Sequence, residues 1–135
     1  MNAGYDYDTI IVGGGPGGST AGAFLAQAGH KVRILEKLKF PRFRIGESLL
    51  PFGNDVLKAS GAWPKIESAG FIPKLGAEFF VGNDSKQLRF WFRKNLPPAY
   101  STTFQVERAK FDEILLNHAA ECGCEVRHEC PAKSV

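Results

Sequence analysis

Three glycines near the N-terminus have the spacing that holds the diphosphate of a dinucleotide. Gly13, Gly15 and Gly18 form a G-x-G-x-x-G pattern, in which the first glycine permits a tight turn and the second lets the backbone approach the pyrophosphate. The third lets a helix pack closely against a strand. We expect Pro16 and Ser19, in the first turn of that helix, to line the same site, because free N–H groups and the helix dipole bind phosphate there.

A carboxylate follows the glycines at a separation that suits an adenosine ribose. Glu36 comes after the second apolar run of the chain, roughly 20 residues beyond the last glycine, where dinucleotide-binding domains carry an acidic residue. Its oxygens can accept hydrogen bonds from both ribose hydroxyls and would repel a 2′-phosphate, so the site disfavours NADP.

The elements around these residues have the order of a strand, a turn, a helix and a second strand. Residues 7–12 are β-branched and apolar enough to predict a strand buried on both faces. Apolar residues at helical spacing predict a helix over residues 16–28, which Gly29 ends, and residues 31–35 predict the next strand. Because these parts and the acid coincide within about 30 residues, we prefer a dinucleotide site to a merely structural glycine-rich loop.

Beyond residue 60 the pattern changes from helical to extended and then back. Turn residues at 82–85 predict an antiparallel hairpin, and a helix followed by a strand near the C-terminus suggests that the parallel sheet resumes. The further predicted elements are a helix over 52–60, extended segments over 74–81, 87–93 and 101–107, a helix over 111–122 and a strand over 125–128.

We therefore expect an α/β, Rossmann-like three-layer fold with a parallel sheet, incomplete in this chain. Residues 1–60 and 108–135 would form the Rossmann-like part, and about 61–107 an antiparallel insertion that contributes to a substrate domain. We expect the aromatic side chains around the predicted hairpin to pack in a core, or else to form the wall of a substrate pocket. They are Phe79, Phe80, Phe90, Trp91 and Phe92.

The composition is that of an ordinary globular protein. The 135 residues are 44% apolar and 23% charged, and no apolar stretch approaches the roughly 20 residues that span a bilayer. Because the acidic residues Asp6 and Asp8 stand close to the N-terminus, we expect no signal peptide and a cytoplasmic location. The three cysteines and three histidines lack metal-ligand or disulfide-framework spacing, so we predict no metal.

A basic run follows the second strand, with six Lys and Arg residues between positions 31 and 44. Such a run can bind nucleic acid, but it follows a dinucleotide motif and carries few stacking aromatics. We expect no nucleic-acid partner.

The segment at residues 40–51 (FPRFRIGESLLP) is distinctive, as is residues 104–116 (FQVERAKFDEILL). Together with the glycines and Glu36, they resemble the N-terminal part of the FAD-dependent monooxygenase superfamily. Within it, residues 40–51 are most similar to flavin-dependent halogenases of the tryptophan-halogenase-like branch. Related hydroxylases and geranylgeranyl-reductase-like enzymes carry similar stretches, and the resemblance covers nearly all of the chain.

The resemblance implies that FAD is the cofactor, with its diphosphate on the three glycines and its adenosine ribose on Glu36. Guanidinium groups suit phosphate oxygens, and a polar loop can satisfy the edges of a flavin ring. The remaining residues implied to contact FAD are Arg42, the loop of Ile45, Gly46, Glu47 and Ser48, and the pair Gln105 and Arg108.

Lys74, within residues 70–78 (GFIPKLGAE), matches the lysine that such halogenases are thought to use to receive hypohalous acid. The resemblance implies that reduced flavin and oxygen oxidise halide, and that the lysine passes electrophilic halogen to an aromatic or electron-rich substrate, small or carrier-bound. A separate flavin reductase would then be a partner. The simpler interpretation is an exposed lysine at a strand end.

Two other functions stay open, a flavin-dependent hydroxylase or reductase of the same superfamily and a non-catalytic nucleotide-binding module. The family's later Trp-rich motif and flavin-closing Gly-Asp segment do not occur before Val135, and Trp91 does not replace them. We therefore expect a fragment with partial FAD binding and no turnover.

Overall fold

A three-stranded parallel sheet forms the base of the molecule. The computed structural model describes residues 4–82 and 86–134, so most of the turn expected at 82–85 lies outside the described residues. The strands β1 (Thr9–Val12), β2 (Val32–Leu35) and β7 (Glu125–Arg127) pair in the order β1-β2-β7. In the register, Thr9 is opposite Val32, and Arg33 is opposite Glu125. The expected return of the chain to the parallel sheet is confirmed.

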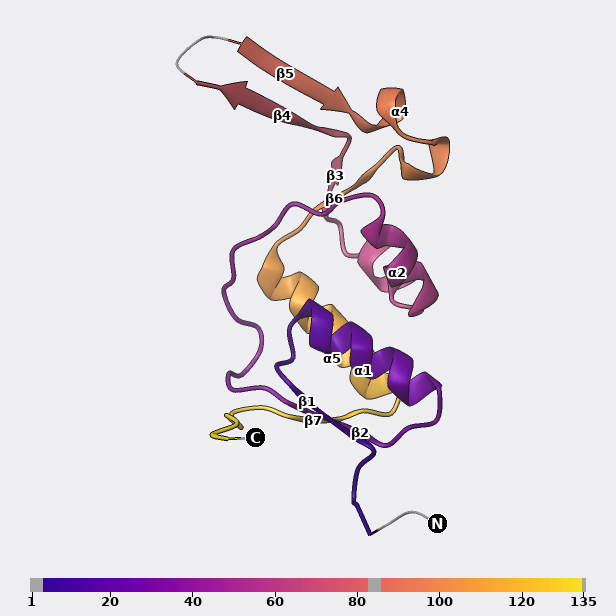
Figure 1. Ribbon diagram of the computed structural model, residues 1–135, viewed down its shortest axis with the longest axis vertical. Helices are drawn as coiled ribbons and strands as arrows, with labels where there is room; N and C mark the ends of the chain where they lie inside the picture. Colours follow the sequence, from indigo (N-terminus) through magenta and orange to yellow (C-terminus); the bar gives the residue numbers. More distant parts are fainter. Residues whose placement is uncertain (1–3, 83–85, 135) are drawn as a thin grey trace.

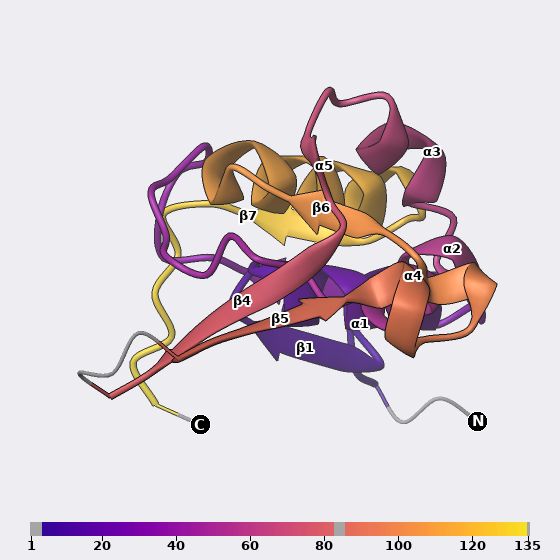
Figure 2. The ribbon, with the colours of Figure 1, turned by 90° about the horizontal axis from the view of Figure 1, so that it is seen from above.

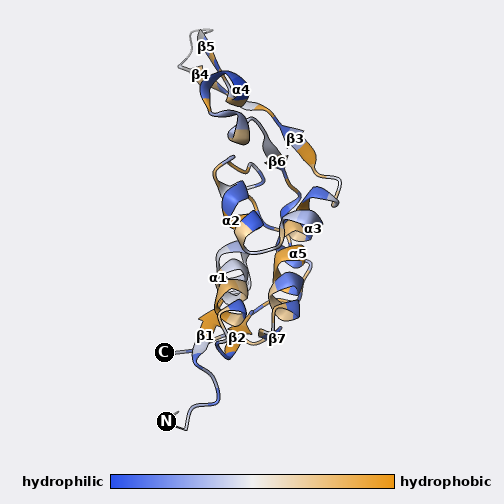
Figure 3. Ribbon diagram, turned by 90° about the vertical axis from the view of Figure 1, so that its right-hand side faces the viewer, coloured by the Kyte–Doolittle hydropathy of each residue, from blue (hydrophilic) through white to orange (hydrophobic). Residues whose placement is uncertain are grey.

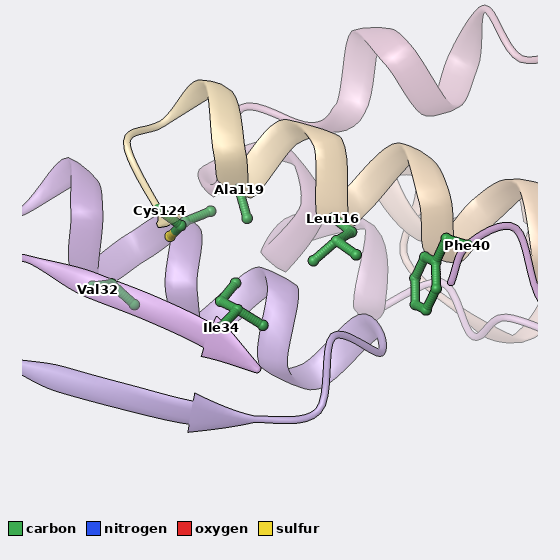
Figure 4. Packing of buried hydrophobic residues seen from close by; sticks show 7 residues of the cluster. Val32, Ile34, Phe40, Leu116, Ala119 and Cys124 are labelled. Atoms are coloured by element: carbon green, nitrogen blue, oxygen red, sulfur yellow. The ribbon is translucent and has the colours of Figure 1, made fainter. Parts of the chain in front are cut away.

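Two helices lie side by side on one face of this sheet (Figure 1). They are α1 (Pro16–Gln27) and α5 (Arg108–Glu121), which match the helices expected from the glycine turn and from the C-terminal apolar spacing. Side chains of β2 point toward both helices (Figure 4). The resulting core cluster comprises Ala23, Val32, Ile34, Phe40, Leu116, Ala119 and Cys124.

On the opposite face of the sheet, the side chains of β1 are exposed. On β1, which is strongly hydrophobic (Figure 3), Ile10 is 56% exposed and Val12 is 59% exposed. The prediction that β1 is buried on both faces is therefore met on the helix side only. A strand exposes alternate side chains to opposite faces, and α1 and α5 cover just one of them.

A second core cluster joins two short helices to the other end of α5. The helix α2 (Gly53–Ala59) was expected, whereas α3 (Trp63–Glu67) was not. Pro64 is compatible with helix because it lies in the first turn, where its missing N–H costs nothing. The buried members of this cluster are Leu57, Ala62, Ile66, Val106, Phe111 and Leu115.

Two antiparallel pairs rise from this body (Figures 1 and 2). The strand β3 (Ile72–Lys74) pairs with β6 (Thr103–Gln105) close to the helices. The hairpin of β4 (Gly76–Val81) and β5 (Lys86–Trp91) projects away from the sheet and helices, and it confirms the predicted antiparallel pairing. The segments α4 (Phe92–Asn95) and η1 (Pro98–Tyr100) connect it to β6.

The end of the hairpin differs from the sequence prediction. The expected strand over 87–93 stops at Trp91, because Phe92 is buried at 3% exposure and its N–H donates to the Leu75 carbonyl. The Asn95 amide then donates to the carbonyl of Trp91, which closes the helical turn of α4. The prediction that the hairpin aromatics pack in a core holds for Phe92 only. The others are exposed in this chain, namely Phe79, Phe80, Phe90 and Trp91.

Candidate functional site

The glycine turn joins β1 to α1 as the sequence predicts. Gly13 has a φ of +105°, which favours glycine, and a Cβ on Gly18 would lie 2.0 Å from the Gly13 carbonyl oxygen. Among the described residues, no side chain caps the N-terminus of α1, so its first N–H groups can bind an anion. The Ser19 hydroxyl is buried and donates to the Gly14 carbonyl. Ser19 thus stabilises the turn, and its hydroxyl is directed at the protein.

The Glu36 carboxylate lies directly beneath this turn. It is only 3% exposed, and its two oxygens accept hydrogen bonds from the N–H groups of Gly14 at 2.8 Å and Leu38 at 2.9 Å. Each oxygen keeps a second lone pair for another donor. The carboxylate is therefore fixed in place by backbone and retains capacity to accept a ribose hydroxyl.

A cavity of about 340 Å³ opens beside the turn and Glu36, and both line it. Its walls come from the end of β1, the end of β2 and the segment after β7. Positive side chains gather at this cavity, as a diphosphate requires. The lining includes Gly13, Gly15, Glu36, Lys37, Arg42, Arg44 and Cys130.

Arg42 lies beside the glycine turn in a largely buried setting. Its side chain is 9% exposed, its guanidinium stacks on the Phe40 ring at 4.3 Å, and a Cβ on Gly15 would lie 3.4 Å from its Nη2. Its Nε is 3.9 Å from a Glu36 oxygen and has no hydrogen-bond partner within the described ranges. Arg42 Nη1 donates to Asp112 at 2.9 Å. The unpaired Nε leaves this guanidinium a free donor, which fits an anionic ligand.

The polar loop of residues 45–48 is attached to β6 and to the start of α5. Ser48 forms an isolated antiparallel bridge with Gln105, and the Glu47 carbonyl accepts the N–H of Val106 at 2.8 Å. Arg108 Nη1 donates to the Ile45 carbonyl at 2.8 Å. Sequence positions more than 50 apart are thus brought together, which places the loop beside both residues expected to join it.

Lys74 ends β3, where it pairs with Thr103 of β6. It is partly buried, its Nζ donates to the Leu49 carbonyl at 2.9 Å, and Nζ lies 5.5 Å from the centroid of the Phe92 ring. The lysine is therefore tied to the chain directly after Ser48. It is not the free strand-end lysine of the simpler interpretation.

Asp112 is the buried residue of this region that the sequence analysis missed. It is fully buried on α5, between two arginines. The signal was present, because an acid stands within the apolar helical stripe of Phe111 and Leu115, four residues after Arg108.

The basic run does not form one surface patch. Arg42 is buried at the turn, whereas Arg33 pairs with Glu125 on the sheet at 3.2 Å.

Within residues 4–82 and 86–134, no group of three or more His, Cys, Asp or Glu side chains is placed to hold a metal ion. In the same residues, no helix has the length and apolarity to cross a membrane.

A parallel sheet with a glycine turn, a buried acid after β2 and a cationic cavity lined by both defines a Rossmann-like nucleotide-binding domain. The family model described as "FAD binding domain" matches residues 6–135, and the chain belongs to that family. Its cofactor is FAD, and its relatives are flavin-dependent halogenases.

Three relatives show the level of similarity. A 1H-pyrrole-2-carbonyl-(peptidyl-carrier protein) chlorinase of Pseudomonas fluorescens is 41% identical, over 90% of this chain and 31% of the relative. The structure of the myxobacterial chondrochloren halogenase CndH is 40% identical with a TM-score of 0.84, over 91% of this chain and 28% of that one. The structure of the flavin-dependent halogenase CmlS is 39% identical with a TM-score of 0.85, over 93% of this chain and 23% of that one. The chain thus spans less than a third of these relatives.

Proposed function

We propose that the chain is the FAD-binding portion of a flavin-dependent halogenase that acts on an aromatic or carrier-bound substrate. The halogenase relatives and the contacts of Lys74 support this proposal. A halide, molecular oxygen and a separate flavin reductase would be the other partners. The cytoplasmic location stays a prediction.

The residues that we propose hold FAD match it in charge and hydrogen bonding. The first turn of α1 and Arg42 would bind the diphosphate, and Glu36 would accept hydrogen bonds from the hydroxyls of the adenosine ribose. The loop of Ile45, Gly46, Glu47 and Ser48, held by Gln105 and Arg108, would contact the flavin. When FAD is bound and reduced, its reaction with molecular oxygen would provide the oxidant for the halide.

The observation that carries the halogenase assignment is the bond from Lys74 Nζ to the Leu49 carbonyl. Leu49 follows directly on the loop proposed to contact the flavin, so the amine would be anchored next to the proposed cofactor site. A lysine amine is compact and can rotate its three donors. From this anchored position we propose that it holds hypohalous acid by hydrogen bonding and directs it to the substrate.

Replacing this lysine tests the assignment, and Lys110 offers a matched control. Lys110 Nζ also donates to a backbone carbonyl, that of Ala69, and also lies over a phenyl ring, that of Phe71. We expect Lys74→Ala in the whole protein to abolish halogenated product while flavin oxidation and FAD affinity persist. Lys110→Ala should leave product formation near the wild-type rate.

The measurement is product formation by mass spectrometry alongside flavin oxidation by absorbance, with chloride and bromide in turn. Unchanged halogenation by Lys74→Ala would remove the proposed role of this lysine. A hydroxylated product from the wild-type protein, insensitive to halide, would instead establish the flavin-dependent hydroxylase.

A further inference from the structure

A buried ion cluster connects the two parts of the proposed cofactor site. Asp112 lies on α5 with 0% exposure, and its carboxylate accepts hydrogen bonds from two guanidinium groups. Oδ1 accepts from Arg108 Nε at 2.7 Å. Oδ2 accepts from Arg108 Nη2 at 3.0 Å and from Arg42 Nη1 at 2.9 Å. One acid thus sets the position of two cations that come from segments 66 residues apart in the chain.

Each of the two arginines has another group to offer beyond Asp112. The Nη2 of Arg42 lies 3.4 Å from where a Gly15 Cβ would be, on the proposed diphosphate side. The Nη1 of Arg108 donates to the carbonyl of Ile45 and lies 3.1 Å from where a Gly46 Cβ would be, on the proposed flavin side. Bidentate pairing fixes a guanidinium in orientation as well as in position.

We propose that Asp112 is the positioning residue of the cofactor site, which aims Arg42 at the FAD diphosphate and locks Arg108 against the flavin-side loop. This inference rests on the proposed FAD-binding roles of these arginines. Burial supports it, since a carboxylate removed from water is retained only where charges and hydrogen bonds compensate it. The hydrogen bonds that Arg108 donates to Asp112 also raise the pKa of Arg108 above its ordinary value.

Simple electrostatics and positioning predict opposite effects when this acid is neutralised. The diphosphate of FAD is anionic, so removal of a nearby negative charge should tighten binding if Asp112 acts through charge alone. If Asp112 orients Arg42, the same change should weaken binding, because the guanidinium loses its place beside Gly15. The sign of the change in affinity therefore separates the two interpretations.

The test measures FAD affinity by flavin fluorescence quenching for the wild-type protein, Asp112→Asn and Glu113→Gln. The control removes the same charge from the next residue of α5. We expect Asp112→Asn to weaken FAD binding by about tenfold or more, the loss typical of a hydrogen bond to a charged group. Glu113→Gln should change it by less than about twofold, as for residues without a shared partner.

A double-mutant cycle shows whether the effect passes through Arg42. In an Arg42→Lys background, Asp112→Asn should change FAD affinity by only about twofold or less, because the fork that Asp112 orients is already absent. A purely structural Asp112 would cost the same affinity in both backgrounds, and that result would overturn the inference.

Two further outcomes have separate meanings. If wild-type protein binds FAD and Asp112→Asn binds it equally or more tightly, the positioning role is wrong while the proposed function stands. If wild-type protein does not bind FAD, the proposed function itself fails. If thermal melting shows that Asp112→Asn does not fold, Asp112→Glu replaces it in the test, because glutamate keeps the charge but displaces it. Wild-type FAD affinity in that variant would also overturn the inference.

Discussion

Gly17 and Gly18 are neighbours in the first turn of α1, yet the space around them differs. A Cβ on Gly18 would lie 2.0 Å from the Gly13 carbonyl oxygen, whereas no neighbouring atom of the part of the chain that the structure describes lies within 4 Å of a Cβ on Gly17. We expect Gly18→Ala to lower the free energy of unfolding by about 1–3 kcal/mol or more, because backbone must shift to admit the methyl group.

Gly17→Ala is the matched control for that substitution. It should be neutral or raise the free energy of unfolding by about 0.4–1 kcal/mol, since alanine restricts the unfolded chain. Urea denaturation of both variants measures the difference. Equal stabilities would show that the close packing of α1 against the turn does not constrain this position.

Residue types at the site were predictable where local geometry dictates them. The glycine turn and Glu36 lie in adjacent segments, so spacing alone placed them together. Asp112 was missed because its partners, Arg42 and Arg108, become neighbours only when α5 packs beside the glycine turn. The hydrogen bond from the Ser19 hydroxyl to the Gly14 carbonyl is not revealed by helix spacing, and the expectation that Ser19 lines the cofactor site stays a prediction.

Among the elements, β7 depends on a polar cluster that joins it to β2. Glu125 accepts hydrogen bonds from the hydroxyl of Tyr7 and from Arg127, and it pairs with Arg33. These bonds, that from Tyr7 foremost, lower the pKa of Glu125 from 4.5 to about 2. A lowered carboxyl pKa means that the folded state binds the proton less readily than the unfolded state does.

The stabilisation by Glu125 should therefore be complete above pH 4.5, the ordinary pKa, and fall as the pH drops toward about 2. Because its side chain is 34% exposed, solvent screening reduces the effect. As the pH is lowered between these two values, the melting temperatures of wild-type protein and Glu125→Gln should converge. An equal pH dependence in both proteins, with the exposed Glu67→Gln as control, would contradict the role of this cluster.

Long periodic elements were easier to predict than short ones. The helices α1 and α5 and the pairing of β4 with β5 follow from patterns of six residues or more. The helices α3 and α4 are short, and tertiary contacts decide them: Ile66 is fully buried, and the burial of Phe92 ends β5. The expectation that the hairpin aromatics pack in a core is wrong for the exposed ones, because hydrophobicity alone does not say whether this chain covers them. The alternative, that they form the wall of a substrate pocket, stays a prediction.

At the scale of the whole molecule, the chain supplies a sheet with helices on one face and an antiparallel extension above them. The glycine turn, Glu36 and Arg42 converge at one end of this sheet, where β1 and β2 both finish. Ligands of open α/β sheets bind beyond the carboxyl ends of the strands. This arrangement and the family membership together lead to the central prediction, that this end of the sheet binds the adenosine and diphosphate half of FAD.

Competition between cofactor halves tests that prediction most directly. FAD bound to the purified protein is titrated with ADP, which carries adenosine and diphosphate, and separately with FMN, which carries the flavin and one phosphate. We expect ADP to displace FAD at lower concentrations than FMN does. We also expect Glu36→Gln to weaken the binding of ADP more than the binding of FMN. Displacement by FMN at equal or lower concentrations than ADP, or no binding of FAD, would contradict the account.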